Sequence, residues 1–289
     1  MTKQSWQFYA GMVYALRPLW QFAGTQKERI GGMTDAATAS PPKRPVNSWL
    51  VRLGKRQRKW INPFIIRHSK VGDEPVFDRS HFPWISQLES EWEAIRDEAL
   101  AVLKHRDAIP PLAEISPDHK GLDNQNKWRS YFLWGYGFRI DKNCERCPQT
   151  SAALKAVPGL RTAMFSIHDP GMEIPPHKGV TAGMCVFHLG LKTPQDAANC
   201  AIRVKDKVVH WKEGEAFVFD DTKEHETWNR TDDERVILLV QFDRPVRFPG
   251  NIVASLFFHA VRRSSFVGNA RKQLGNWEDT FRKFEKADE

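Results

Sequence analysis

The sequence predicts a mainly β protein with flanking helices, built around a double-stranded β-helix, or jelly roll, of the cupin-like kind. From Thr162 onward, short apolar runs alternate with Gly, Pro and Asp, and two tight turns follow at 205–207 and 212–214. Several short strands at such close spacing are typical of double-sheet barrels. The predicted strands are Ala163–His168, Met184–Leu191, Ala201–Val204, Val208–Trp211, Ala216–Phe219, His225–Trp228 and Arg235–Phe242.

Helices are predicted ahead of these strands. Residues 83–104 form the clearest one, because apolar side chains recur there at spacings of three and four. The repeating positions are Ile85, Leu88, Trp92, Ile95, Ala99 and Val102. Pro83 near the start and acidic residues early in the segment agree with helix-start preferences. A shorter helix is predicted from Thr150 to Ala156, and we expect both apolar faces to belong to the core.

The chain has 289 residues, which is enough for one domain with extensions. We expect an aromatic segment and flexible linker over 1–45, a basic amphipathic segment over 46–79, a jelly-roll domain with N-terminal helices over 80–245, and a basic helical tail over 246–289. The 46–79 segment suits either an interfacial element or a solvated helix packed on the domain. Both interpretations stay open.

The net charge of +8 is unevenly distributed. Residues 1–79 hold 14 Lys/Arg and 5 Asp/Glu, residues 80–243 hold 20 and 25, and residues 244–289 hold 9 and 5. A nucleic-acid enzyme would concentrate its basic face around the active-site domain, so we expect no nucleic-acid partner. Basic ends on an acidic middle are typical of docking on an anionic surface such as a membrane.

No apolar run reaches the ~20 residues that a membrane span needs. The N-terminus also lacks a signal peptide's order of basic, apolar and small residues. The sequence therefore predicts a cytoplasmic protein that could lie peripherally on the inner face of the membrane. Residues 252–263 carry large apolar side chains followed by Arg262 and Arg263. They suit a shallow membrane anchor and a helix packed on the barrel equally well.

The four cysteines do not favour a disulfide framework. Cys144 and Cys147 form a lone CxxC, and Cys185 and Cys200 supply no matching pair. We therefore expect reduced cysteines here rather than a structural zinc site.

His177 and His225 stand 48 residues apart with strand-rich sequence between them. Separated strands of a jelly roll can bring such residues together, and two imidazoles suit an open iron site. The carboxylate usually found two residues after the first His is replaced here by Gly179. The chain thus either binds iron through two His and water or does not bind it. Asp220 and Asp221 could orient an imidazole, or be solvated turn carboxylates.

A set of short sequence motifs surrounds these histidines. They are Phe165-Ser166-Ile167, Pro170-Gly171, Pro176-His177, Gly179, His188-Leu189-Gly190-Leu191, Trp211, Glu213-Gly214, Phe219-Asp220-Asp221, His225-Glu226, Trp228 and Arg235. Together with their spacings, they resemble the aspartyl/asparaginyl β-hydroxylase family of Fe(II)- and 2-oxoglutarate-dependent dioxygenases. The resemblance implies a hydroxylase that uses Fe(II), 2-oxoglutarate as cosubstrate and O2.

Site roles follow from the resemblance residue by residue. It implies that His177 and His225 are the iron ligands. Gly179 matches the branch of the family that binds iron through two His without a carboxylate. It also implies that Arg235 and Ser166 hold the distal carboxylate of 2-oxoglutarate. A planar guanidinium suits a buried carboxylate, although a strand-edge Arg235 paired with Asp232 or Asp233 is the alternative.

Two further roles concern the other end of the cosubstrate. The resemblance implies that His188 contacts the metal-binding end of 2-oxoglutarate. The family usually has Arg two residues before this His, and this chain has Val186. Affinity for 2-oxoglutarate then depends on whether another base, such as Arg129 or Arg203, reaches the site.

Sequence motifs in residues 82–165 help to distinguish between the possible classes of substrate. They are Phe82-Pro83, Leu88, Trp92-Glu93, Ile95-Arg96, Trp128-Arg129, Tyr131, Phe132-Leu133, Tyr136-Gly137, Cys147-Pro148 and Ala163-Met164-Phe165. They resemble the bacterial lipid A and ornithine-lipid acyl-chain hydroxylases of the family, which implies a lipid substrate at a membrane surface. An Asp/Asn β-hydroxylase acting on a protein or a small amino-acid derivative, and a non-enzymatic cupin-like binding domain, stay open. The oligomeric state cannot be predicted.

Overall fold

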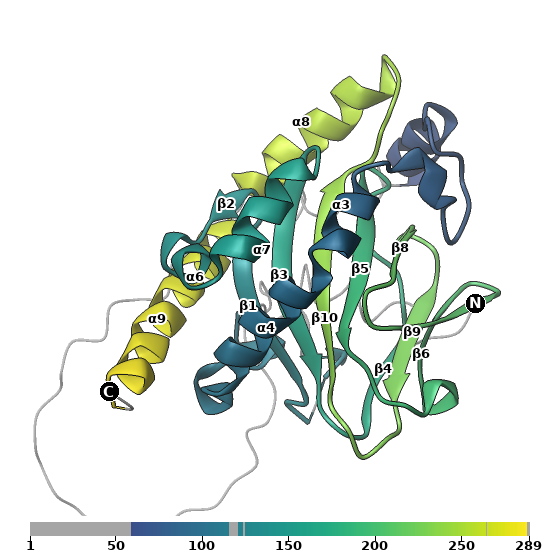
Figure 1. The fold of residues 1–289 in the computed structure, drawn as a ribbon. Coiled ribbons are helices and arrows are strands. Elements are labelled where there is room, and N and C mark those ends of the chain that lie inside the picture. The colour runs from purple at the N-terminus through teal and green to yellow at the C-terminus, as the bar shows by residue number, and fades with distance from the viewer. Residues whose placement is uncertain (1–58, 116–120, 124, 264, 288–289) are drawn as a thin grey trace, which may run out of the picture.

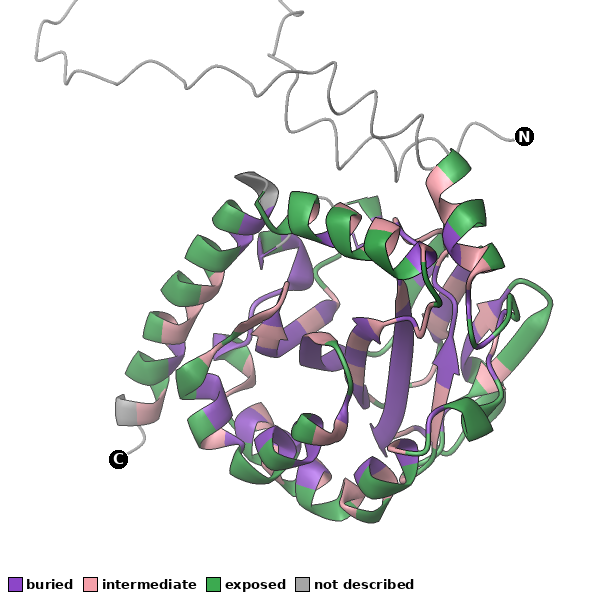
Figure 2. Ribbon diagram, turned by 90° about the horizontal axis from the view of Figure 1, so that it is seen from above, coloured by how far each residue is buried: buried purple, intermediate pink, exposed green. Residues whose placement is uncertain are grey.

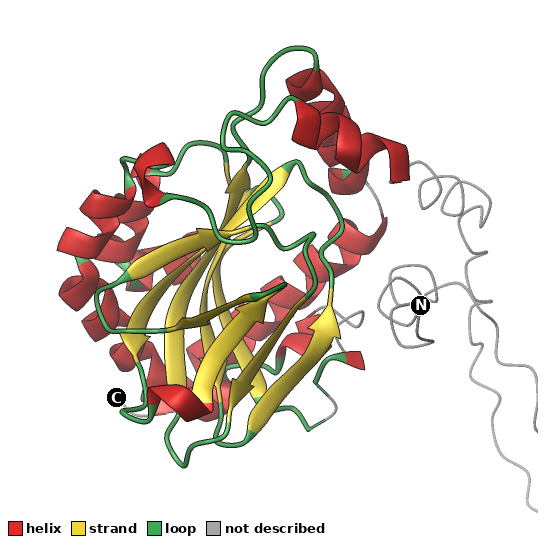
Figure 3. Cartoon of the chain, turned by 90° about the vertical axis from the view of Figure 1, so that its right-hand side faces the viewer, coloured by secondary structure: helices red, strands yellow, loops and turns green. Residues whose placement is uncertain are grey.

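Two antiparallel sheets face each other in the computed structural model, and most of the helices lie on the side of the six-stranded sheet (Figure 1). The structure describes residues 59–115, 121–123, 125–263 and 265–287. One sheet has the strand order β2-β1-β3-β10-β5-β8 and the other β4-β9-β6-β7. Figure 3 shows the two layers opening toward a common interior. The predicted mainly β, jelly-roll fold class is confirmed.

The strands match most of the predicted runs. Their bounds are β1 Trp128–Gly135, β2 Phe138–Arg139, β3 Leu160–His168, β4 Met172–His177, β5 Met184–Lys192, β6 Cys200–Val204, β7 Lys207–His210, β8 Ala216–Phe219, β9 His225–Asn229 and β10 Arg235–Asp243. The strands β1, β2 and β4 were not predicted. β4 contains Pro175 and Pro176, which cannot donate to a ladder and argue against a strand. They lie where the β4–β9 register shifts between Ile174 and His177.

The predicted helix over 83–104 is two helices. Its parts are α3 (Ile85–Ser90) and α4 (Trp92–Leu103), and Glu91 between them has non-helical dihedral angles. The predicted helix over 150–156 corresponds to α7 (Pro148–Ala153) and the 3-10 turn η5 (Leu154–Ala156). The other elements are η2 (Arg79–His81), η3 (Arg106–Ala108), α5 (Leu112–Ile115), α6 (Asp141–Arg146), η6 (Ala197–Asn199), α8 (Gly250–Arg262) and α9 (Ser265–Ala287).

The main core lies between α3, α4 and one face of the six-stranded sheet. Side chains of a strand alternate between two faces, and here one set is uniformly apolar. Phe165 and Ile167 of β3, Phe187 of β5 and Leu238 of β10 belong to this core. Figure 2 shows the buried strands enclosed by helices whose outer sides are exposed. The alternate set of side chains faces the second sheet and is available to line a site.

Some predicted segments lie outside the described residues. The segment 1–45 does so entirely, and so does 46–58 of the basic amphipathic segment. Residues 59–67 are helical, and α8 and α9 occupy the basic tail. Within the described ranges, no helix is long and apolar enough to cross a membrane.

Candidate active site

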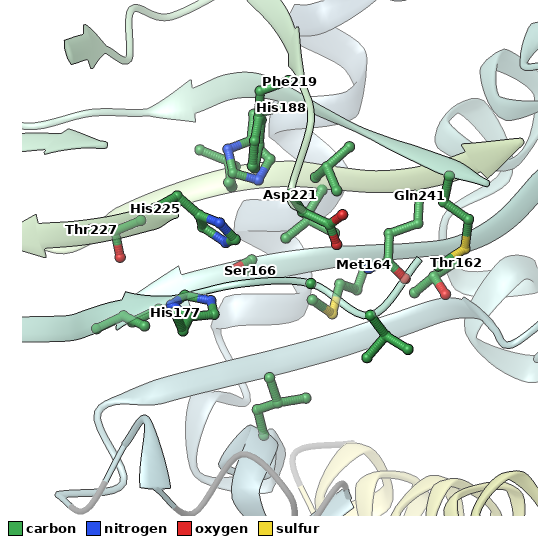
Figure 4. A pocket seen from close by; sticks show the side chains of 18 of the residues that line it. Thr162, Met164, Ser166, His177, His188, Phe219, Asp221, His225, Thr227 and Gln241 are labelled. Carbon is green, nitrogen blue, oxygen red and sulfur yellow. The ribbon is translucent and has the colours of Figure 1, made fainter. Parts of the chain in front are cut away.

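His177 and His225 are directly paired across strands β4 and β9. Their ring centroids lie 4.1 Å apart, and Figure 4 shows both rings at one end of the cavity. Each ring bonds through Nδ1 to the carbonyl two residues earlier, Pro175 O and Lys223 O, both at 2.9 Å. Such bonds fix the ring and direct Nε2 toward a metal. Burial lowers the pKa of His225, which favours the neutral, metal-binding form.

The carboxylate of Asp221 occupies the space beside Gly179. A Cβ atom added at Gly179 would lie 2.2 Å from Asp221 Cγ, and Gly179 N donates to Asp221 O at 2.6 Å. Burial raises the pKa of Asp221 to about 8, and Asp220 adds to the rise. Across the described ranges, no three His, Cys, Asp or Glu side chains converge to hold a metal ion. The two His are therefore the candidate donors, with Asp221 beside them.

The Asp220 carboxylate does not orient an imidazole, which was the role that the sequence suggested for it. It pairs with Arg244, and both side chains are fully buried. Asp220 also accepts hydrogen bonds from Thr222 N and Oγ1, at 3.0 and 2.6 Å. Its carboxylate thus fixes the loop between β8 and β9 rather than an imidazole, because the loop backbone and Arg244 take its oxygens.

Arg235 is a buried cation with unsatisfied donors. It is 1% exposed, and its Nε and Nη2 atoms have no hydrogen-bond partner. Neither Asp232 nor Asp233 pairs with it, so that alternative does not apply; its guanidinium instead lies 4.5 Å from the centroid of Trp211. Burial lowers its pKa to about 10. A buried charge without a counter-ion is costly, so this site fits an anion.

His188 and Ser166 present two further donors. Trp211 Nε1 donates to His188 Nδ1 at 3.3 Å, which places the ring hydrogen on Nε2, and that buried atom has no partner. Burial holds the pKa of His188 well below its usual value, so the ring is neutral. Trp128 Nε1 donates to Ser166 Oγ at 3.0 Å, which leaves the hydroxyl hydrogen to donate elsewhere.

Sequence reasoning missed His168 and Thr227. Both line the same cavity, and each has a buried polar atom without a partner, His168 Nδ1 and Thr227 Oγ1. His168 pairs in register with Arg235, and burial keeps its pKa well below the usual value. The alternation of side chains along a strand could have identified His168, because it is two residues from Ser166 and therefore points to the same face of the sheet.

One cavity of about 240 Å³ is lined by His177, His225, Asp221, Arg235, His188, Ser166, His168 and Thr227, but not by Asp220. Three residue pairs across β3 and β10 continue it along the sheet: Ser166–Ile237, Met164–Leu239 and Thr162–Gln241. From His168 to Thr162 this row spans about 20 Å. Figure 4 shows Thr162 and Gln241 at the end away from the two His. The cavity therefore has a polar end and a longer, mostly apolar arm.

Val186 lines the apolar arm and is paired with Gln241. Among the described residues, neither Arg129 nor Arg203 takes the place of the Arg that the family usually has here. Arg203 bonds Glu226 at 2.7 Å, and Arg129 bonds Ile109 O at 2.7 Å. Neither lines the cavity. Among the described residues, Arg235 is therefore the one arginine that lines this cavity.

The fold and the site define a jelly-roll protein in which two paired histidines share a cavity with a buried arginine that has unpartnered donors. Residues 89–245 match the family model described as Aspartyl/Asparaginyl beta-hydroxylase. The chain belongs to the aspartyl/asparaginyl β-hydroxylase family, and it is thereby a member of a hydroxylase family.

Two relatives illustrate the range of the family. The chain is 38% identical to ornithine lipid ester-linked acyl 2-hydroxylase of Rhizobium tropici over 222 residues, covering 77% of this chain and 79% of that protein. It is 32% identical to human aspartyl/asparaginyl beta-hydroxylase over 170 residues, which cover 57% of this chain and only 22% of the human protein. The first match includes most of both chains, whereas the second is confined to one part of a longer protein.

Proposed function

We propose that this protein is an Fe(II)- and 2-oxoglutarate-dependent hydroxylase that acts on the acyl chain of a lipid. His177 and His225 would hold the metal. Arg235 and Ser166 would hold the distal carboxylate of 2-oxoglutarate, and His188 would donate through Nε2–H to its metal-binding end. Bound iron would couple oxidative decarboxylation of 2-oxoglutarate by O2, giving succinate and CO2, to insertion of one oxygen atom into a C–H bond.

The buried, unpaired guanidinium of Arg235 is the observation that carries this proposal. It shares the cavity with His177 and His225, and its free Nε and Nη2 can bond both oxygens of a carboxylate. Ser166, on the neighbouring strand β3, has a hydroxyl hydrogen available to the same anion. A buried cation without a counter-ion is easiest to understand when an anionic ligand completes the site.

The apolar arm supports an acyl chain as the substrate. Met164, Val186 and Leu239 line it between the polar end and α8. A chain of methylene groups could lie there without leaving a charge unpaired, whereas an Asp or Asn side chain would find no basic partner at Val186. The similarity to an acyl 2-hydroxylase over 79% of that protein agrees with this choice.

The chain's own residues would position the two His rings and the acyl chain, and would exclude water from the cavity. The carbonyl bonds to His177 and His225 fix both rings before any metal binds. Asp221, whose Oδ1 is buried and unpartnered, would supply a hydrogen-bonding oxygen beside the two His. The apolar arm would keep the acyl chain in one orientation, so that a single carbon faces the metal.

The test is a 2-oxoglutarate consumption assay with Fe(II) and detergent-dispersed ornithine lipid or lipid A, followed by mass spectrometry of the lipids. We expect succinate formation coupled to a one-oxygen mass gain on an acyl chain. A matched assay with Asp- and Asn-containing peptides tests the other activity of the family. Hydroxylated peptide with unchanged lipid would overturn the lipid assignment, and no turnover of 2-oxoglutarate with either class would overturn the enzyme assignment.

A further inference from the structure

Large apolar side chains are exposed together at one end of the molecule. Of the eight large hydrophobic residues exposed among those described, five lie in α8, just before it, or in the helix at 59–67. They are Trp60 (79% exposed), Phe64 (37%), Phe248 (74%), Ile252 (48%) and Leu256 (66%). Because Phe248, Ile252 and Leu256 are spaced by four residues, they lie along one side of the chain entering and forming α8.

The segments next to these two helices are joined by backbone hydrogen bonds. Arg247 N donates to His68 O and Lys70 N donates to Pro245 O, both at 2.8 Å. The side chain of His68 also lies where a Cβ at Gly250 would be. Figures 1 and 2 both show residues 59–67 beside the N-terminal end of α8. The exposed apolar residues of these two neighbouring segments lie at the same end of the molecule, and we call them together the α8 face.

The charged residues within the two segments that carry the α8 face are of one sign. Residues 244–277 contain six Lys/Arg and no Asp or Glu, and residues 59–70 contain three and none. Arg67, Arg247 and Arg263 are exposed. By contrast, residues 80–243 are acidic on balance, with 20 Lys/Arg against 25 Asp/Glu. Exposed apolar side chains among basic ones, without carboxylates, suit the headgroup region of an anionic bilayer.

The opposite side of α8 belongs to the candidate active site. Phe257, Phe258 and Val261 line the same cavity as the two His. Phe258 is buried and lies under the Arg161 guanidinium, 3.9 Å from its ring centroid. One helix thus separates the exposed apolar surface from the apolar arm, so a lipid held on the outside would be one helix diameter from the cavity.

We propose that the α8 face docks the protein on an anionic lipid bilayer, with Phe248, Ile252 and Leu256 in the headgroup region and the flanking arginines on the lipid phosphates. This inference rests on the proposed function in one respect: the lipid hydroxylase needs access to acyl chains in the membrane. The charge along these segments favours a bilayer over a second protein, because a protein partner with complementary carboxylates would not need three exposed apolar side chains in line.

The experiment is vesicle co-sedimentation of the full, metal-free chain with phosphatidylglycerol–phosphatidylethanolamine vesicles. Ile252→Asp/Leu256→Asp tests the apolar stripe, and Val208→Asp is the matched control on exposed strand β7. We expect the double variant to bind at least tenfold more weakly and Val208→Asp to bind as the wild type does. Arg247→Glu/Arg263→Glu should weaken binding by about thirtyfold, and added salt should weaken the wild type.

Wild-type binding by the double Asp variant, or an equal loss in Val208→Asp, would overturn the proposal. So would a wild-type dimer in analytical ultracentrifugation without vesicles that the double variant converts to a monomer, because the α8 face would then be an interface between two copies. If the proposed function is wrong but docking is right, the protein will bind vesicles as expected and will not turn over detergent-dispersed lipid. Turnover of dispersed lipid without vesicle binding would instead refute docking alone.

Discussion

Asp221 fills the space that a side chain at Gly179 would occupy, with 2.2 Å between its Cγ and the position of a Cβ at 179. The position two residues after His177, where the usual iron triad has its carboxylate, is therefore packed against a carboxylate from another loop. That loop is fixed by the buried Asp220–Arg244 ion pair. A glycine at 179 is then a requirement of this packing, and not merely the loss of a ligand.

Gly179→Ala is expected to lower iron affinity about tenfold to a hundredfold, the range typical of groups that support metal ligands. The added methyl group must displace Asp221 or the His177 segment. Gly275→Ala is the control, since a Cβ there meets nothing within 4 Å. Titration with Fe(II) under anaerobic conditions measures both. Unchanged affinity in Gly179→Ala would show that Asp221 and the 179 backbone can move apart without affecting the metal.

Arg235→Met should separate a ligand-binding role from a structural one. Replacing a buried unpaired cation with an apolar side chain is expected to leave the Tm of the ligand-free protein unchanged or higher. The same variant should lose the increase in Tm that 2-oxoglutarate causes, with affinity weakened about a hundredfold or more. Differential scanning calorimetry with Fe(II) and 2-oxoglutarate, without O2, gives both values.

Arg230→Met is the control for that measurement, because Arg230 is exposed and pairs with Glu173. It should keep the full 2-oxoglutarate response. If Arg235→Met is strongly destabilised without ligand yet still responds to 2-oxoglutarate, the guanidinium is a structural element and the cosubstrate lies elsewhere.

Val186→Arg should reduce acyl-chain turnover at least tenfold. A charge in the apolar arm would be buried without a partner, at a cost of several kcal/mol. Affinity for 2-oxoglutarate should not weaken, since Val186 is paired with Gln241, at the end of the cavity away from the two His (Figure 4). Val186→Leu controls for size. Steady-state kinetics with dispersed lipid and a separate 2-oxoglutarate titration distinguish the two effects, and undiminished lipid turnover in Val186→Arg would place the acyl chain outside this arm.

The Asp220–Arg244 pair predicts a large effect on stability. Arg244→Ala leaves the Asp220 carboxylate buried without its counter-ion, so the free energy of unfolding should fall by about 3–5 kcal/mol. Arg230→Ala removes an ion pair in which both side chains are 55% exposed, and should cost less than about 1 kcal/mol. Urea denaturation compares them. Equal small losses would mean that the loop carrying Asp221 is held by other contacts.

Much of the fold could be predicted because the strands carry local signals. β8 has the predicted bounds, Ala216–Phe219, and β5 and β10 each extend one residue beyond theirs. β4 could not be predicted because Pro175 and Pro176 contradict a ladder, and only pairing with β9 shows that they fall at a register shift. The break at Glu91 likewise interrupts an apolar periodicity that continues on both sides.

The candidate site could be predicted in part. His177 and His225 were identified through spacing and family resemblance, and the structure brings them together. The contact between Gly179 and Asp221 could not be foreseen, because it depends on how two loops pack. His168 and Thr227 belong to strands with no signal beyond alternation, so their place in the cavity becomes visible only when both sheets are assembled.

The most direct test of the central claim is the iron content of anaerobically Fe(II)-loaded protein after desalting. The wild type should retain about one iron per chain through His177 and His225, and His177→Ala/His225→Ala should retain almost none. His210→Ala, at an exposed position on β7, should behave as the wild type does. Equal iron in the wild type and the double variant would contradict the two-histidine metal centre.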